Sequence, residues 1–327
     1  MSSGVPAVLA LDPVFSDAVF PPDTLARLRR RFDLRGPFAQ LGSVDLRKTE
    51  ALITGWGAPS IDADILDQAP NLRAIIHSAG SVKGIVGAEV FERGIVVSSA
   101  AVANARPVAE YTAAVAVLAS KGVLPPAALT RLTGADSIRP DGIGLLGSTV
   151  GVVGASRIGR LVAVKLVELG ARVLLADPYA TQETAAELGA ELTDLDSLCL
   201  RSDIVTIHAP QLPETLHMFD KRRLALMPDG AVLVNTARGS LVDHDALADE
   251  CTAGRLRAVL DVTDPEPLPA DHPLHRLPDV LITPHLAGAS GRERRLLGEF
   301  AADEAERFLA GEPLTGLVRL EDLERSA

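Results

Sequence analysis

The sequence predicts an α/β protein of two domains, each built on a doubly wound parallel sheet. Three observations predict this class: the chain length, an alternation of short apolar runs with helical patterns, and a second such alternation that begins beside a glycine-rich turn. With 327 residues, of which 47% are hydrophobic, the chain can bury two cores of ordinary size. Strands that alternate with crossover helices are typical of parallel sheets.

The first alternation covers residues 8–98. Runs rich in Val, Ile and Leu predict strands at 8–11, 52–54, 72–77 and 95–98. Amphipathic patterns between them predict helices at 22–32 and 61–69. A longer apolar helical pattern at 107–121 predicts a buried helix that leads into the second domain.

The second alternation predicts strands at 149–153, 172–176, 204–207, 231–235, 257–260 and 280–282. Helices are expected at 158–169, from 183, and at 246–253. A last amphipathic helix, after Gly291 and up to about 309, is expected to return to the first domain. We therefore expect one domain from residues 1–104 and 290–327, and another from residues 105–289.

The charge balance excludes two broad classes of partner. A net charge of −11 and an isoelectric point near 5.1 provide no basic excess to neutralise the phosphates of nucleic acids or anionic membranes. The first residues lack a basic segment ahead of their short apolar run, and no later stretch stays apolar long enough to span a bilayer. We expect a cytoplasmic protein with neither nucleic acid nor membrane as partner.

Metal binding is not expected either. The two cysteines, Cys199 and Cys251, lie far apart in sequence and lack the spacing of a disulfide framework or a zinc site. Both are expected to be small buried apolar residues. The histidines in the polar and proline-rich stretches, including His272 and His275, show no ligand spacing.

A glycine-rich turn, Gly154-Ala-Ser-Arg-Ile-Gly159, follows an apolar strand and opens a helix. This order is typical of a dinucleotide site, in which the helix N-terminus binds a diphosphate. Ser156 occupies the position of the middle glycine, and either crowds the diphosphate or donates a hydrogen bond to it. An ordinary strand-to-helix turn is the alternative. The expected cofactor contacts here are Gly154, Ser156, Arg157, Ile158 and Gly159.

Asp177 follows the second strand of this domain, where a carboxylate can accept hydrogen bonds from an adenosine ribose. The same carboxylate would repel a 2′-phosphate, which favours NAD over NADP. Because Asp177 precedes Pro178, its alternative role is to form a turn at the strand end.

Three further motifs carry residues suited to catalysis: Asn235-Thr-Ala-Arg-Gly239, Glu266-Pro267 and Thr283-Pro-His285. Arg238 follows a parallel strand, at the edge where ligands bind, and its planar cation matches a carboxylate. His285 can exchange a proton near neutral pH, and Glu266 can hold its second ring nitrogen. Each residue alone has an ordinary structural role as its alternative, and only the three together favour catalysis.

These motifs resemble those of the D-isomer-specific 2-hydroxyacid dehydrogenases. The resemblance covers nearly the whole chain and is densest from Leu146 to Gly288. It implies a Rossmann NAD-binding domain, a flavodoxin-like substrate domain, and a homodimer formed through the cofactor domain. It also implies that Arg238 binds the substrate carboxylate, that His285 is the general acid/base, and that Glu266 supports His285.

The resemblance implies further binding residues. The nicotinamide side of the cofactor would contact His208, Pro210, Thr236, Ala237 and Asp261, and the substrate would contact Ser78, Ala79, Gly80 and Ser81 together with Arg238. Backbone N–H groups of this last loop can bind an anion, and an ordinary strand-to-helix turn is the alternative. The family more often continues the loop with glycine and aspartate, whereas this chain has Val82-Lys83-Gly84. Trp56, after another strand, is a candidate specificity residue, and simple packing beside its neighbouring glycines is the alternative.

The expected ligand is thus NAD with a small anionic substrate, a 2-keto or D-2-hydroxy acid. One alternative is a regulatory protein that senses NAD on the same scaffold, as corepressors similar to this family do. Another is a dehydrogenase of a different small anion, such as formate or phosphite. Formate enzymes usually carry glutamine where Glu266 stands, so Glu266 counts against formate but not against phosphite.

Overall fold

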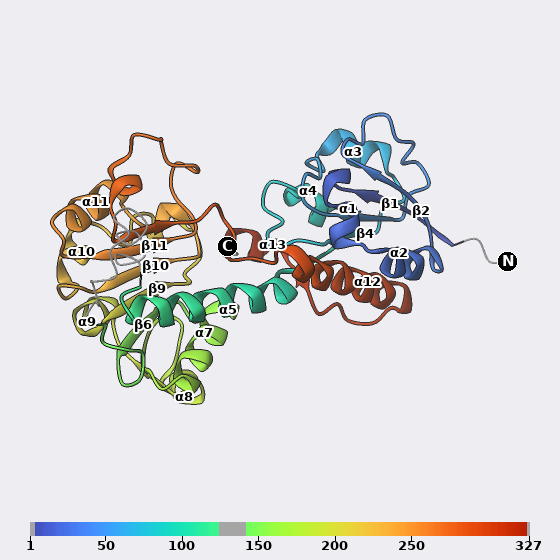
Figure 1. Ribbon diagram of the computed structural model, residues 1–327. Coiled ribbons are helices and arrows are strands. Elements are labelled where there is room, and N and C mark those ends of the chain that lie inside the picture. The colour runs from blue at the N-terminus through green and yellow to red at the C-terminus, as the bar shows by residue number, and fades with distance from the viewer. Residues whose placement is uncertain (1–3, 124–141, 326–327) are drawn as a thin grey trace. The chain divides into compact units, whose positions relative to one another are not determined.

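A computed structural model describes residues 4–123 and 142–325 of the chain. The described residues divide into two compact units. Unit 1 contains those up to Asn104 and those from Ala289 onward, and unit 2 contains those of Ala105–Gly288. Each unit is an α/β structure around its own, mostly parallel sheet, so the predicted fold class is confirmed (Figure 1).

The sheet of unit 1 has the strand order β13-β5-β4-β3-β1-β2. Among the described strands of this sheet, only β13 is antiparallel to its neighbour. The order reverses between β1 and β3, as in flavodoxin-like sheets. The strands are β1 (Val5–Ala10), β2 (Phe32–Phe38), β3 (Ala51–Thr54), β4 (Ala74–His77), β5 (Val96–Ser99) and β13 (Leu317–Val318).

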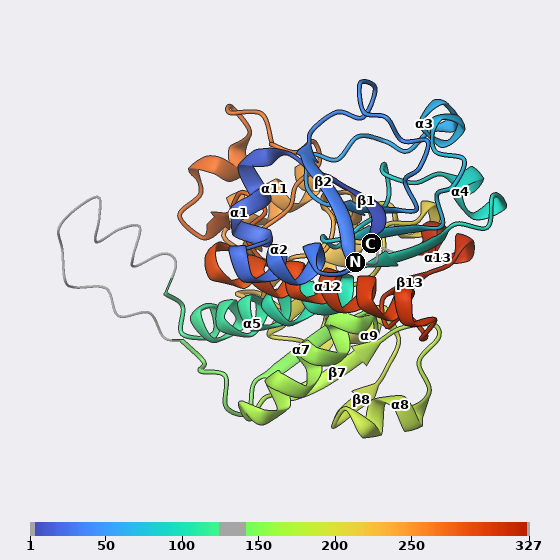
Figure 2. The same ribbon diagram turned by 90° about the vertical axis from the view of Figure 1, so that its right-hand side faces the viewer.

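Helices cover both faces of this sheet, because neighbouring residues of β1 point to opposite sides. Ala7 and Leu9 pack with α1, α2 and α12, whereas Val8 and Ala10 pack with α3 and α4. Figure 2 shows α1, α2 and α12 grouped together. The helices are α1 (Pro13–Val19), α2 (Pro22–Arg29), α3 (Ala63–Gln68), α4 (Ala88–Glu92), α12 (Arg294–Ala310) and α13 (Leu320–Arg325).

The sheet of unit 2 is parallel throughout and has the order β12-β11-β10-β9-β6-β7-β8. The order reverses between β6 and β9, which is the arrangement of dinucleotide-binding Rossmann folds. The strands are β6 (Thr149–Val153), β7 (Arg172–Ala176), β8 (Ala190–Leu192), β9 (Ile204–Ile207), β10 (Val232–Asn235), β11 (Arg257–Leu260) and β12 (Val280–Ile282).

Two layers of helices enclose this second sheet. On one face α5 and α7 pack side by side, and on the other lie α9, α10 and α11 (Figures 1 and 2). The helices are α5 (Ala101–Ser120), α7 (Arg157–Glu168), α8 (Gln182–Glu187), α9 (Leu195–Arg201), α10 (Lys221–Leu226) and α11 (His244–Thr252). None of the helices in the described part of the chain has the length and apolar character needed to cross a bilayer.

Two of the predicted helices have different bounds in the structure. The helix expected at 22–32 ends at Arg29, and the next residues form β2, which was missed because Gly36 and Pro37 interrupt its strand pattern. Proline is tolerated there because β2 lies at the sheet edge. The helix expected from 107 begins at Ala101 and continues through the buried Pro107. Packing of this helix outweighs the backbone hydrogen bond that proline removes.

Candidate active site

The turn after β10 is closed by the side chain of Asn235. Its amide nitrogen donates to the carbonyl of Arg238 (2.8 Å), and its amide oxygen accepts from the N–H of Ala237 (3.0 Å). Asn235 is fully buried. At the other end of the turn, a Cβ on Gly239 would lie 2.0 Å from the carbonyl carbon of Thr263, so only glycine fits. This motif therefore fixes the backbone that carries Arg238.

Arg238 is a half-buried cation whose charge has few polar partners among the described residues. Its Nη1 donates to the carbonyl oxygen of Ala237 (2.7 Å), and no carboxylate of the described residues forms an ion pair with it. Burial lowers the pKa of the Arg238 guanidinium, and the nearby charge of Glu266 raises it. A guanidinium in this state can bind a carboxylate through its remaining donors.

His285 and Glu266 form a direct pair, as the sequence predicts for them. The Nδ1 atom of His285 lies 2.8 Å from Oε1 of Glu266. This leaves Nε2 of the ring for another partner, and the His285 side chain is 52% exposed. The backbone of His285 has φ = 54°, which is rare for a residue with a Cβ and concentrates at functional sites.

Asp261 holds the segment that carries His285. Its carboxylate accepts from the hydroxyl of Thr283 (2.6 Å) and from the N–H groups of Leu286 (2.7 Å) and Ala287 (2.9 Å). Its carbonyl also accepts from the N–H of His285 (2.9 Å). Asp261 is 1% exposed. Three of its roughly four acceptor positions are thus occupied within the chain, which leaves about one for a nicotinamide carboxamide.

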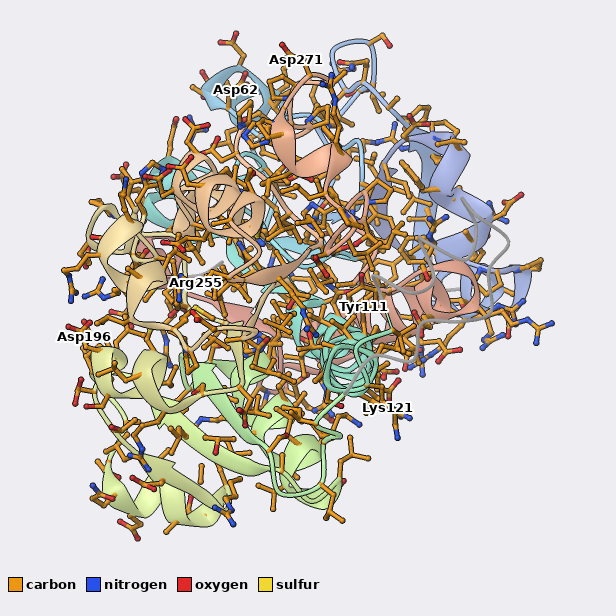
Figure 3. All side chains as sticks on the ribbon, turned by 60° about the vertical axis from the view of Figure 1, so that its left-hand side comes forward. Asp62, Tyr111, Lys121, Asp196, Arg255 and Asp271 are labelled. Atoms are coloured by element: carbon orange, nitrogen blue, oxygen red, sulfur yellow. The ribbon has the colours of Figure 1, made fainter. Side chains whose placement is uncertain are left out.

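Helix α5 supports the same segment from the side. Figure 3 shows Tyr111 on this helix, and its hydroxyl lies 2.8 Å from Oγ1 of Thr283. Oγ1 of the next residue, Thr112, lies 3.1 Å from Oγ1 of Thr236. Sequence reasoning missed both residues, because nothing local marks a helix residue as the partner of a distant loop.

The glycine-rich turn between β6 and α7 has the geometry of a dinucleotide site. Gly154 has φ = 97°, and a Cβ on it would lie 2.8 Å from the backbone of His208. A Cβ on Gly159 would lie 2.0 Å from the carbonyl oxygen of Gly154. Both glycines are therefore required for strand β9 and helix α7 to approach the turn this closely.

Ser156 is the N-cap of α7. Its Oγ accepts from the N–H of Gly159 (3.2 Å), and its backbone is extended, with φ = −60°. A non-glycine residue is thus accommodated without backbone strain, and the hydroxyl hydrogen is still available for donation. Arg157 is exposed in the first turn of α7, followed by Ile158.

Asp177 directly follows β7 and connects it to the glycine-rich turn. One carboxylate oxygen accepts from the N–H of Ala155 (2.6 Å) and the other from the N–H of Tyr179 (2.7 Å). The turn-forming role considered for Asp177 is therefore present. Each oxygen retains a lone pair, so the same carboxylate can also accept from ribose hydroxyls.

His208 and Pro210 follow β9 beside this turn. Burial lowers the pKa of His208 to about 3, so the ring is neutral, and its Nε2 lies 2.9 Å from Oγ1 of Thr206. Its Nδ1 is buried without a hydrogen-bond partner among the described residues. An unsatisfied buried nitrogen is costly, and a cofactor group placed here would satisfy it. The residues of this edge therefore fit a dinucleotide.

The predicted substrate loop follows β4 in unit 1. Ser78 is buried, and both its N–H and its hydroxyl donate to the carbonyl of Thr54 (2.7 and 2.8 Å). The N–H groups of Ala79, Gly80 and Ser81 have no acceptor among the described residues. Three consecutive free N–H groups can bind an anion.

Unit 2 thus brings Arg238, Glu266 and His285 together after β10, β11 and β12, at one edge of its sheet. Thr236 and Ala237 lie in the same turn as Arg238 and are mostly buried. Within residues 4–123 and 142–325, no group of three His, Cys, Asp or Glu side chains is placed to hold a metal ion. The Arg238 cation can bind an anion, and the Glu266–His285 pair can transfer a proton.

Comparison with known proteins assigns the family. Residues 128–287 match the model of the D-isomer specific 2-hydroxyacid dehydrogenase NAD binding domain. A glyoxylate reductase of Korarchaeum cryptofilum is 31% identical over 94% of this chain and 96% of its own length. One from Thermofilum pendens is 35% identical over 80% and 79%. The chain therefore belongs to the D-isomer specific 2-hydroxyacid dehydrogenase family.

Other relatives are longer. A D-3-phosphoglycerate dehydrogenase of Mycobacterium bovis is 36% identical over 89% of this chain but only 56% of the relative, so the chain spans about half the length of such proteins. Among solved structures, the TT0316 protein from Thermus thermophilus is 33% identical, with a TM-score of 0.78 over 96% of this chain and 100% of that one.

Proposed function

We propose that this protein is an NAD-dependent oxidoreductase that interconverts a small 2-keto acid and the corresponding D-2-hydroxy acid. The observation that carries the proposal is the 2.8 Å Glu266–His285 contact beside Arg238, a half-buried cation with no ion-pair partner among the described residues. A proton donor and a carboxylate receptor at one sheet edge are what reduction of a keto acid requires.

The roles of the three residues follow from their chemistry. Arg238 binds the substrate carboxylate and orients the keto group. His285 donates the proton from Nε2 to the C2 oxygen, while Glu266 holds Nδ1 and stabilises the correct tautomer. When bound, NADH supplies the hydride to C2, so the carbonyl gains one hydride and one proton and becomes an alcohol.

The cofactor contacts of the proposal are the residues of the glycine-rich turn with Asp177, and, nearer the nicotinamide, His208, Pro210, Thr236, Ala237 and Asp261. Asp177 supports NAD over NADP because its carboxylate would repel a 2′-phosphate. The orphaned Nδ1 of His208 supports the placement of a polar cofactor group beside β9.

The proposal includes a homodimer formed through unit 2. Large apolar side chains are exposed on two of its packed helices, namely Leu118 on α5 and Leu161 and Val164 on α7, and also at Leu146. Exposed apolar side chains on neighbouring helices are typical of interaction surfaces. Light scattering should give twice the chain mass, and Leu161→Asp should shift it toward the monomer; a monomeric wild type would contradict this part of the proposal.

The test of the activity follows NADH oxidation by absorbance with glyoxylate, hydroxypyruvate, pyruvate and phenylpyruvate, and with phosphite and NAD⁺ in the reverse direction. Turnover of a 2-keto acid that is lost in both His285→Ala and Arg238→Ala supports the proposal, as does a D-configured product. Tight NADH binding without turnover of any keto acid would contradict it and favour an NAD sensor. Turnover of phosphite but of no keto acid would show that the substrate is a different small anion.

A further inference from the structure

Arg294, the first residue of α12, is held between two aromatic rings of unit 1. Its guanidinium carbon lies 5.8 Å from the ring centroid of Phe15 and 5.7 Å from that of Trp56. The two rings meet edge to face, with centroids 5.6 Å apart. All three residues are half-buried. These contacts fix where the cation lies.

Within residues 4–123 and 142–325, the guanidinium of Arg294 has no anionic partner. Its Nε is buried without a hydrogen-bond partner, and among the described residues no carboxylate forms an ion pair with Arg294. Cation–π contacts stabilise the charge through the ring faces, but they leave the in-plane N–H donors unused. A buried donor without an acceptor is costly, so an anion placed at the guanidinium edge would be bound favourably.

The position of this cation in the sheet is that of a ligand site. Phe15 follows β1 and Trp56 follows β3, and the strand order of unit 1 reverses between these two strands. In open parallel sheets, ligands bind outside the carboxyl ends of the strands at this point. The predicted substrate loop adjoins it, since a Cβ on Gly55, next to Trp56, would lie 2.8 Å from Oγ of Ser78.

We propose that Arg294, with Phe15 and Trp56, forms an anion subsite that binds a second acidic group of the substrate. This rests on the proposed function, in which the substrate is a 2-keto acid, and every residue of the subsite lies in unit 1. The group at Arg294 is then a carboxylate or phosphate at the far end of the acid. The favoured substrates are 2-keto acids that bear such a group, in preference to pyruvate or glyoxylate.

Kinetics with matched substrates test the subsite. We expect Arg294→Met to lower kcat/KM for oxaloacetate and for 3-phosphohydroxypyruvate by about 30-fold or more, and for pyruvate by less than about threefold. The larger of the first two losses identifies which acid the subsite prefers. Arg294→Lys should retain part of the selectivity, and Arg295→Met, at the exposed neighbouring arginine, should change none of these values. An equal loss on all substrates, or no loss, would overturn the subsite.

A second readout does not depend on turnover. Trp56 is the only tryptophan of the chain, so intrinsic fluorescence reports on this subsite. Succinate and phosphoglycolate should change the fluorescence of the wild type, propionate should not, and Arg294→Met should abolish the response. If no keto acid is reduced but this response is present, the proposed function fails and the anion subsite stands. If keto acids are reduced but this response is absent, the subsite fails and the activity stands.

Discussion

Arg238 and Arg294 occupy comparable places in the two units, yet they are held in different ways. Arg238 follows a strand at the carboxyl edge of its sheet, and Arg294 contacts two rings that follow strands at the carboxyl edge of the other sheet. Both arginines are half-buried, and neither has an ion-pair partner among the described residues. Arg238 is fixed by its own turn, through Asn235 and Ala237. Arg294 is fixed by Phe15 and Trp56, which are distant in sequence. A short sequence motif is therefore enough to predict the first arginine, whereas no local pattern indicates the second.

The largest expected effect comes from removing the motif-held cation. Arg238→Gln should lower kcat/KM for every 2-keto acid by about 10³-fold, because a half-buried charged contact to the substrate is worth several kcal/mol. This uniform loss contrasts with the substrate-selective loss expected at Arg294. Steady-state kinetics measure it, with Arg172→Gln, exposed at the opposite end of β7, as the control. A loss below tenfold would contradict the assigned role.

A smaller effect is expected at the buried carboxylate of unit 2. Asp261→Asn replaces one acceptor with a donor that faces the N–H groups of the His285 segment. We expect kcat to fall by about 10- to 100-fold and the free energy of unfolding to fall by about 1–3 kcal/mol. Thermal unfolding and kinetics on the same sample test both. Unchanged kcat with lowered stability would show that Asp261 does not position His285.

Unit 1 also contains a buried carboxylate that accepts several hydrogen bonds, Glu304. We expect its loss to lower stability without changing catalysis. Glu304 is fully buried and accepts from Ser98, from the N–H and hydroxyl of Thr315, and from the N–H of Gly316. Burial is the largest single influence on the pKa of Glu304 and raises it, but these hydrogen bonds together outweigh it and lower the pKa below its ordinary value.

A lowered pKa means that ionised Glu304 stabilises the fold above the pKa of the unfolded chain, about 4.3. This contribution is lost as the pH falls through the lower folded value. Glu304→Gln should therefore cost about 1–3 kcal/mol at pH 7, and the difference from the wild type should shrink below about pH 4. Denaturant unfolding at several pH values measures this. A difference that grows on acidification would have the wrong sign.

The sequence predicted the fold class and most of the strands, because both sheets use continuous apolar runs separated by helical patterns. The sequence motifs also grouped Arg238, Glu266 and His285 as one candidate catalytic set, and the 2.8 Å contact between Glu266 and His285 agrees with that grouping. These residues follow neighbouring parallel strands, so strand order alone places them at one edge.

The roles of Asp261, Ser156 and Arg294 could not be predicted, because they depend on the path of the folded backbone and on packing between residues distant in sequence. The carboxylate of Asp261 accepts three hydrogen bonds from the Thr283–Ala287 segment, one from a hydroxyl and two from N–H groups. The two N–H groups face Asp261 only because the chain turns at His285. Ser156 proved to be a helix cap because its Oγ faces the N–H of Gly159. Arg294 appeared only when α12 packed against residues near the start of the chain.

The central claim is that Glu266 acts in catalysis through His285, and a double-mutant cycle on kcat tests it most directly. His285→Gln, Glu266→Gln and the double variant are compared with the wild type under NADH and one 2-keto acid. Because the two residues would act as a unit, the double variant should be no more than about threefold slower than His285→Gln alone. A double variant slowed by the product of the two single losses would contradict the claim.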